Sequence, residues 1–168
     1  MNQQIIVGAL SNMIMYFEAD PRRSQHSLKV HNFSRVIGHL EGLSDEEIHL
    51  LELAAIFHDI GIKESEAKYQ TADFHPQEGP TVTRVLLAEF GLPESQLETI
   101  CHMVEHHHEY GKPHGTPLQI LIEADFLVNI FEGNIHNLSV QEIEDKFFET
   151  KTGISYLRCM YGNAYDTP

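Results

Sequence analysis

Hydrophobic and polar residues follow one another along most of this chain with the spacing of an α-helix. Apolar residues recur at intervals of three and four positions, which places them on one face of a helix. The Val-Ile-Thr alternation that is typical of β-strands is absent over runs of four or more residues. The pattern predicts helices at 3–18, 20–40, 44–58, 78–90, 94–108, 118–132, 139–148 and 151–161. We therefore expect an all-α fold in which the helices pack as one globular bundle.

Residues that favour helix ends support several of these boundaries. Asp20-Pro21 offers a capping side chain followed by a proline, which is favoured in the first turn. Ser44 opens a Ser-Asp-Glu-Glu capping box, and Ser139 opens a second box with a glutamate three positions later. Residues 62–76 are the least regular stretch, and we expect a loop over a site there. The chain contains neither a repeat nor a linker, so we expect a single domain over residues 1–168.

The composition limits the kinds of partner that the chain can bind. With histidines neutral, the formal net charge is −14, whereas proteins that bind duplex nucleic acid or anionic membranes need a basic face. No stretch reaches the roughly 18 apolar residues of a membrane-spanning helix. Cys101 and Cys159 do not belong to a Cys-x-x-Cys pair, and we expect both to be reduced packing residues. These features predict a cytoplasmic protein with neither duplex nucleic acid nor a membrane as partner.

His58 and Asp59 stand side by side at the end of a nearly all-apolar stretch, residues 48–57. Burying a carboxylate and an imidazole is costly unless something compensates them. A divalent cation does so, because carboxylate oxygen and imidazole nitrogen are both good ligands for it. Adjacent residues diverge by about 100° on a helix, but at a helix end before Gly61 the backbone can turn both toward one ion.

Helix periodicity identifies two further polar residues that point inward. His26 shares a face with Val30 and Ile37, whereas His31 lies among polar or small residues and is expected to face solvent. Asp125 also lies on an apolar helix face, where a carboxylate is unusual. The ordinary explanation for His26 is a core histidine whose hydrogen bonds are satisfied. The ordinary explanation for Asp125 is an aspartate paired with a buried cation. The chain has only 11 lysines and arginines, which makes the second explanation harder to satisfy.

The chain has twelve histidines, and three of them stand together at positions 106–108. Extending the apolar face of the preceding helix by three and four positions places His107 and His108 inward and His106 outward. A slip of register at the helix end would bring His106 inward instead, so the choice among the three stays open. His75 precedes a helix and would, on its own, be a loop histidine.

The order His26, His58-Asp59, Asp125 resembles that of the HD-domain superfamily of metal-dependent phosphohydrolases. Leu53–Gly61 resembles the central segment of that family, and Glu123–Leu127 resembles the helix that carries its last ligand. The resemblance covers roughly residues 20–132, with helices over 138–161 expected to pack on this unit. It implies an HD-type helical bundle and a first metal site formed by His26, His58, Asp59 and Asp125.

Some members of the family bind a second metal through extra histidines. His75 with Gly79 is similar to their His-x-x-x-Gly element, and His107-His108-Glu109 is similar to their His-His-Glu element. The resemblance therefore implies a second ion held by His75, His107 and His108, with Asp59 bridging the two sites. Ligands of nitrogen and oxygen suit one or two divalent transition metals, namely Mn, Fe, Co, Ni or Zn.

The activity that this resemblance implies is hydrolysis of a small phosphate ester, a nucleotide or another phosphorylated metabolite. Asp59 and Lys63 are the expected catalytic residues, and Arg23 and Lys63 are expected to hold the substrate phosphate. Both cations also fit an ordinary exposed surface. The Gly-Tyr-Pro signature of cyclic-di-nucleotide phosphodiesterases is absent, which argues against that substrate class.

Three other interpretations stay open at this point. The same ligand set is similar to that of HD-type di-iron oxygenases, which cleave carbon bonds with O₂. A non-catalytic module that binds a nucleotide or a metal for regulation is the second. The third is a helical domain whose inward polar residues bond only to one another. The apolar C-terminal helices also leave a homodimer open, because they would bury a dimer contact as easily as a core.

Overall fold

The structure, a computed structural model, describes residues 2–162. It contains no β-strand among those residues, which confirms the all-α prediction. The α-helices are α1 (Asn2–Phe17), α2 (Pro21–Leu40), α3 (Asp45–Phe57), α4 (Ile62–Tyr69), α5 (His75–Leu87), α6 (Glu94–His106), α7 (Thr116–Phe131), α8 (Val140–Phe147) and α9 (Lys151–Tyr161), with a short 3₁₀ helix at Ala88–Phe90.

The predicted capping residues set the helix starts. The side chain of Asp20 accepts a hydrogen bond from the backbone N–H of Arg23, with Pro21 as the first residue of α2. Both predicted capping boxes are formed, at Ser44 for α3 and at Ser139 for α8. Each box satisfies two backbone donors that the helix itself leaves unpaired, so these starts are fixed locally.

The largest error in the predicted elements lies at residues 62–76. The structure has helix α4 there, followed by a short connection, whereas the sequence pattern predicts a loop. An eight-residue helix with one buried residue, Ser65, shows too little apolar periodicity to be recognised. It ends at Gln70, which takes a left-handed conformation with φ 60°. Helix α5 consequently begins at His75, three residues earlier than predicted, with Pro76 in its first turn.

Helix α3 is the centre of the bundle. Nine of its residues are buried, and it packs against α1, α2, α6 and α7. A helix that is apolar on all sides must be surrounded by others, and each fully buried leucine or isoleucine contributes about 1.5–3 kcal/mol through the hydrophobic effect. The end of α3, where His58 and Asp59 stand, is therefore held in the middle of the molecule.

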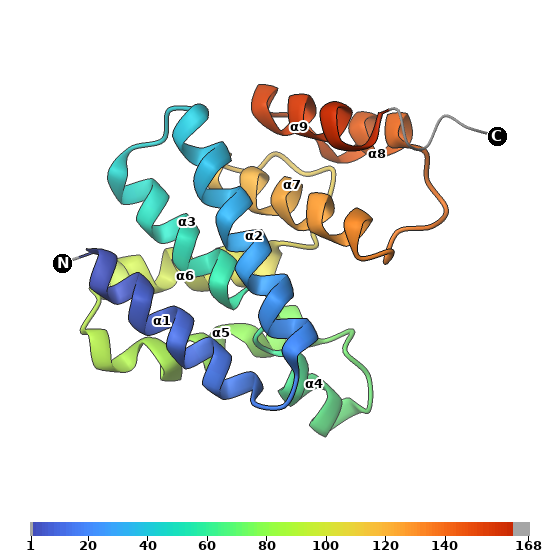
Figure 1. Ribbon diagram of the computed structural model, residues 1–168. Helices are drawn as coiled ribbons and strands as arrows, with labels where there is room; N and C mark the ends of the chain where they lie inside the picture. The colour runs from blue at the N-terminus through green and yellow to red at the C-terminus, as the bar shows by residue number, and fades with distance from the viewer. Residues whose placement is uncertain (1, 163–168) are drawn as a thin grey trace.

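The C-terminal helices are attached to α7 through one buried carboxylate. Figure 1 shows α8 and α9 lying together beside α7. Glu123, which is fully buried, accepts hydrogen bonds from the backbone N–H groups of Glu149 and Thr150 and from the Thr150 hydroxyl. A Cβ atom on Gly153 would lie 1.9 Å from the same carboxylate, so the close approach of α9 requires glycine there.

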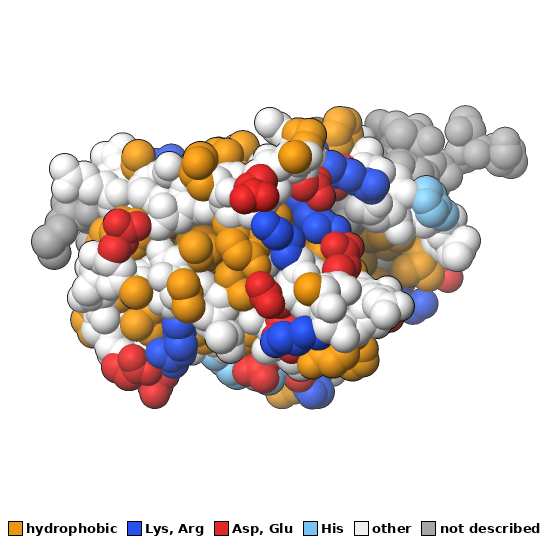
Figure 2. Space-filling model, turned by 90° about the horizontal axis from the view of Figure 1, so that it is seen from below, with side chains coloured by type: hydrophobic (Ala, Val, Ile, Leu, Met, Phe, Trp, Pro, Cys, Tyr) orange, Lys and Arg blue, Asp and Glu red, His pale blue; other side chains and the backbone are white. Residues whose placement is uncertain are grey.

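Three surface features bear on the predictions made from composition. None of the helices in residues 2–162 has the length and apolarity needed to cross a bilayer. On the face seen in Figure 2, acidic and basic side chains are interspersed, with no continuous basic surface. Both cysteines are free, but only Cys101 is buried; Cys159 is exposed on α9, so the packing role expected for it is wrong. Only one face of α9 is buried, that of Gly153, Leu157 and Tyr161, and Cys159 lies outside this face.

Candidate metal centre

Seven of the predicted site residues meet at one place, although they come from five different parts of the chain. His26 lies in the second turn of α2, and His58 and Asp59 directly follow α3. His75 is the first residue of α5, His107 and His108 directly follow α6, and Asp125 lies in the middle of α7. Helix ends contribute most of these residues, which lets neighbouring positions such as His58 and Asp59 point to a common centre.

The first cluster consists of His26, His58 and Asp125, all of which are buried. The Nε2 atoms of His26 and His58 lie 3.1 Å apart, and Oδ1 of Asp125 lies 3.0 Å from the former and 3.6 Å from the latter. One ligand atom from each residue falls within 4.8 Å of the other two. This spacing suits three ligands of one ion.

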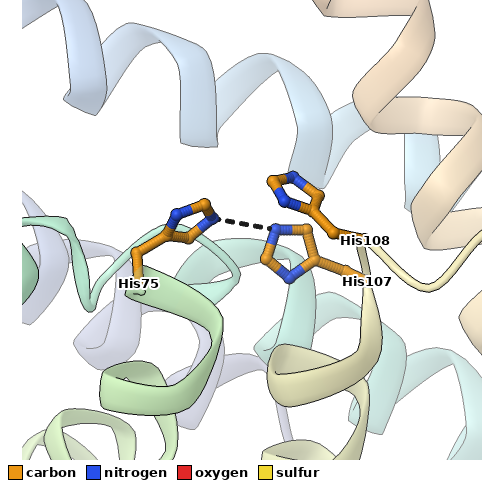
Figure 3. Close-up of side chains that lie close together, drawn as sticks. All are labelled: His75, His107 and His108. Carbon is orange, nitrogen blue, oxygen red and sulfur yellow. Dashed lines mark hydrogen bonds between the residues drawn. The ribbon is translucent and has the colours of Figure 1, made fainter. Parts of the chain in front are cut away.

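The second cluster consists of His75, His107 and His108 (Figure 3). The Nε2 atoms of His75 and His107 lie 3.3 Å apart, and the ring centres of His107 and His108 lie 4.1 Å apart. His75 and His107 are buried, whereas 41% of the His108 side chain is exposed. The structure thus groups His107 and His108, not His106, with His75. The His106 imidazole contacts Glu109 instead, at 2.9 Å.

Asp59 lies between the two clusters and faces both. Its Oδ2 atom is 3.6 Å from Nε2 of His26 and 3.6 Å from Nε2 of His58. Its Oδ1 atom is 3.1 Å from Nε2 of His75 and 3.7 Å from Nε2 of His107. One oxygen of the carboxylate therefore serves each cluster, which is the arrangement of a ligand that bridges two ions.

The backbone fixes the orientation of three of the imidazole rings. The Nδ1 atoms of His58, His75 and His107 lie 2.8, 2.8 and 2.7 Å from the carbonyl oxygen of the residue three positions earlier. A carbonyl oxygen only accepts, so Nδ1 carries the hydrogen and Nε2 of the neutral ring carries a lone pair directed at the centre. Lone pairs that face one another at about 3 Å repel unless a cation lies among them. The donor set therefore fits divalent metal ions.

Two residues that support the centre were not predicted from the sequence. Glu132 Oε2 lies 3.0 Å from Nδ1 of His26, and Lys29 donates to the other Glu132 oxygen at 2.6 Å. Asn129 donates to Oδ1 of Asp125 at 2.8 Å. Positions 125, 129 and 132 share one face of α7 and its end, so periodicity extended from Asp125 was the available signal.

The acidic ligands keep their charge in this environment. Burial raises the pKa of Asp125, but its hydrogen bonds to His26 and His58 outweigh this and hold that pKa well below the ordinary value. Burial lowers the pKa of His26, but the hydrogen bond to Asp125 and the nearby carboxylates raise it to about 9 overall. Burial, followed by the charge of His107, lowers the pKa of His108 to about 3. Without metal, the centre therefore combines an ionised Asp125 with a protonated His26 and, at its exposed edge, a neutral His108. A metal ion would take the place of the proton on His26.

Comparison with known proteins agrees with this geometry. The sequence model described as HD domain matches residues 23–130. This chain belongs to the HD-domain family. Among solved structures, a protein described as a predicted HD superfamily hydrolase from an uncultured Thermotogales bacterium is 20% identical, with a TM-score of 0.70 over 92% of this chain and 84% of its own.

A second structure, described as an HD-superfamily hydrolase from Bacillus thuringiensis, is 14% identical, with a TM-score of 0.64 over 95% of this chain and 90% of its own. At these identities the two structures establish the fold of the HD domain and nothing finer. No curated protein matches the sequence.

A cavity of about 330 Å³ opens beside the candidate metal centre of this HD domain. His26, Asp59 and Arg23 are among the residues that line it. The Arg23 guanidinium donates to Glu66 at 2.6 Å and lies 3.3 Å from Asp20. Arg23 thus lies beside two of the predicted ligands, and its role in holding substrate stays a prediction.

Lys63 is not placed at the centre. Its amine donates to the carbonyl oxygen of Tyr16 at 2.8 Å and lies 4.8 Å from the centre of the Tyr16 ring. It lies 3.8 Å from Glu18 as well, and it does not line the cavity. The prediction assumed a loop after Asp59; because α4 forms there, the first turn of that helix directs Lys63 toward the end of α1.

The expectation that His31 faces solvent is also wrong. Only 12% of its side chain is exposed, and its Nε2 lies 2.9 Å from Glu52 on α3. The polar face of α2 on which His31 lies packs against a polar position of α3, which periodicity within one helix does not reveal. His31 nevertheless lies outside both ligand clusters.

Gly61 allows the two halves of the centre to approach each other. A Cβ atom at this position would lie 2.3 Å from the carbonyl oxygen of His75 and 2.5 Å from the backbone nitrogen of Gly79. Both atoms belong to the main chain and cannot move aside cheaply. A residue other than glycine would therefore push the start of α5, and with it His75, away from Asp59.

Proposed function

We propose that this HD domain is a metal-dependent phosphohydrolase that acts on a small phosphate ester, a nucleotide or another phosphorylated metabolite. The observation that carries the proposal is the position of Asp59, whose two oxygens face two separate groups of ligand nitrogens. Both solved structures that share the fold are described as hydrolases, which supports a hydrolytic reaction.

The residues present fit one or two divalent transition metals. His26, His58, Asp59 and Asp125 would hold a first ion, and Asp59, His75, His107 and His108 would hold a second. A set of imidazoles and carboxylates suits Mn, Fe, Co, Ni or Zn. When bound, such ions lower the pKa of water and stabilise charge on a phosphate oxygen.

The protein side chains contribute binding and orientation. Arg23, on the cavity wall beside His26, offers a planar guanidinium that suits a phosphate group. It now contacts Glu66 and Asp20, so a phosphate has to compete with these carboxylates. Glu132 holds the His26 ring through its Nδ1 atom, which keeps Nε2 directed at the centre.

The test is phosphate release by protein that has been loaded separately with Mn²⁺ and Zn²⁺, measured over a panel of small phosphate esters. We expect release from at least one ester, and its loss in Asp59→Asn. Glu98→Gln, a change of the same chemistry on the exposed face of α6, is the control and should keep the full rate. Failure of the metal-loaded protein to release phosphate from any member of the panel contradicts the proposal.

A di-iron oxygenase is the second candidate, because a set of imidazoles and carboxylates suits iron as well. The two functions separate with a redox-inert metal. A hydrolase works with Zn²⁺, whereas an oxygenase requires iron and consumes O₂. Iron-dependent O₂ uptake after anaerobic loading, together with inactivity of the zinc form, would favour the oxygenase. A metal-loaded protein that binds nucleotides but turns over neither kind of substrate would favour a regulatory module.

The setting that we propose for this reaction is the cytoplasm, supported by the two free cysteines. The net charge of −14 supports a small substrate in preference to duplex nucleic acid.

A further inference from the structure

One wall of the cavity beside the metal centre has no role in the proposed function. Arg22, Asn129 and Asn134, which line the cavity together with His26 and Asp59, form this wall. None of the cavity-lining residues within positions 2–162 is phenylalanine, tyrosine or tryptophan. Of the four described cavities, this one alone is lined by predicted metal ligands. It is therefore the cavity in which the part of a substrate beyond its phosphate would lie.

The three polar residues form a continuous chain of hydrogen bonds that ends at a ligand. Arg22 Nη2 donates to Oδ1 of Asn134, and Nδ2 of Asn134 donates to Oδ1 of Asn129, each at 2.8 Å. Asn129 Nδ2 in turn donates to Oδ1 of Asp125 at 2.8 Å. The rim of the cavity is therefore connected to the first cluster by side chains with fixed orientations.

The turn after α7 positions Asn134, the outer asparagine of this series of hydrogen bonds. The backbone N–H of Asn134 donates to the Asn129 carbonyl oxygen at 2.9 Å, and Gly133 before it has φ 71°. Asn134 is exposed and uses one N–H and one lone pair of its amide in the chain. An amide has two of each, so Asn134 keeps one donor and one acceptor for a ligand. Arg22 is likewise exposed and retains further donors.

We propose, on the basis of the proposed function, that this wall recognises hydroxyl groups and that the substrate is the phosphate monoester of a polyhydroxylated, sugar-like alcohol. Amide and guanidinium groups side by side provide the mixed donors and acceptors that adjacent hydroxyls require. The wall offers no aromatic ring on which a nucleobase would stack. Hydroxyl recognition gives strong selection, because an analogue without hydroxyls leaves polar groups of the site unpaired.

The experiment compares two non-hydrolysable five-carbon ligands, of which only one carries hydroxyl groups. These are the phosphonate analogues of ribose 5-phosphate and of n-pentyl phosphate, titrated by calorimetry into the Mn²⁺-loaded protein. We expect the ribose analogue to bind at least about tenfold more tightly, which corresponds to one or two additional hydrogen bonds. Equal affinities overturn the proposal. Binding of the corresponding adenosine analogue more than tenfold tighter than the ribose analogue also overturns it, because the base would then be recognised.

Variants assign the preference to this wall. Arg22→Ala and Asn134→Ala should each weaken the ribose analogue about tenfold and leave the pentyl analogue within twofold. Arg84→Ala removes an exposed arginine that contacts Glu94 on another face and should change neither affinity. Equal weakening of both analogues would mean that these residues act on the phosphonate alone and would overturn the proposal.

Metal content, measured by elemental analysis on the same samples, separates recognition from support of the ligand. Both variants should retain the metal of the unchanged protein. Loss of metal in Asn134→Ala would show that these hydrogen bonds hold Asp125 in place and do not recognise the substrate, which contradicts the inference.

Turnover of p-nitrophenyl phosphate, which has no hydroxyls of this kind, tests the proposed function separately. If the protein hydrolyses p-nitrophenyl phosphate but does not prefer the ribose analogue, the phosphohydrolase proposal stands and the proposal of hydroxyl recognition fails. Tight, hydroxyl-dependent binding with no hydrolysis of any ester would support the recognition of hydroxyls and contradict the phosphohydrolase proposal.

Discussion

The Nε2 atoms of His26 and His58 lie 3.1 Å apart, although the two residues are separated by 32 positions in the chain. The Nδ1 atom of His58 donates to the Ala55 carbonyl, so its Nε2 presents a lone pair to His26. A proton on His26 satisfies this contact in the metal-free protein, and a metal ion satisfies it better because it also neutralises Asp59 and Asp125. Binding of metal and loss of that proton are therefore linked.

Removing the carboxylate behind His26 should weaken the first metal site. Glu132→Gln loses the charged acceptor of His26 Nδ1 and the partner of Lys29. Changes of this kind typically reduce metal affinity by about 10–100-fold. Competition with a chromophoric chelator measures the effect. Glu98→Gln, on the exposed face of α6, should have the affinity of the unchanged protein, and equal affinities for all three proteins would show that Glu132 does not support the site.

A methyl group at Gly61 should separate the two clusters. In Gly61→Ala the new Cβ would lie 2.3 Å from the His75 carbonyl oxygen, so α5 must shift, at a cost of about 1–3 kcal/mol or more. We expect a lower free energy of unfolding in urea and loss of the metal held by His75. Gly115→Ala is the control, because the nearest atom to its Cβ is 3.9 Å away. Unchanged stability and metal content in Gly61→Ala would refute the close approach.

The stability of the metal-free protein should depend on pH through His26. Its pKa is raised from the ordinary 6.5 to about 9, since Asp125 and the neighbouring carboxylates outweigh the effect of burial. A raised pKa contributes stability that is fully present below about pH 6.5 and is lost as the pH rises through 9. In the presence of a chelator, the Tm advantage of the unchanged protein over His26→Gln should therefore shrink from pH 6 to pH 9.5. An advantage that grows over this range would contradict the ion pairing.

The buried carboxylate of Glu123 should be a major anchor of α9. In Glu123→Ala, the buried N–H and hydroxyl groups of Thr150 lose their acceptor, as does the partly buried N–H of Glu149. Each buried donor without a partner costs about 1–3 kcal/mol. We expect urea denaturation to show a loss of several kcal/mol, with metal content retained, because the Glu123 carboxylate is bonded to the start of α9 and not to the ligands. A loss below 0.5 kcal/mol, the size expected for the exposed control Glu98→Ala, would exclude this role.

The sequence allowed most of the fold, and the meeting of the candidate ligands, to be predicted for physical reasons. His26 and Asp125 interrupt apolar faces of long helices, so periodicity alone shows that they point inward. Capping residues such as Ser44 fix helix starts locally. The second cluster depended on the resemblance, since His75 carries no inward signal of its own.

Other features depend on contacts between elements and left no trace in a single segment. Lys63 was misplaced because α4 is too short to show a pattern, and its first turn directs the amine to Tyr16. His31 was thought to be exposed because Glu52, which covers it, comes from another helix. The series of hydrogen bonds from Arg22 to Asp125 likewise requires the turn at Gly133 to be formed.

Metal content is the most direct test of the central claim that Asp59 joins two groups of ligands around divalent ions. Elemental analysis after loading with Mn²⁺ and removal of free metal should give two equivalents in the unchanged protein. It should give none, or a small fraction of one, in Asp59→Ala. Asp73→Ala, an exposed aspartate on the connection after α4, should retain both. An unchanged protein that holds no metal, or an Asp59→Ala protein that keeps two equivalents, would contradict the account.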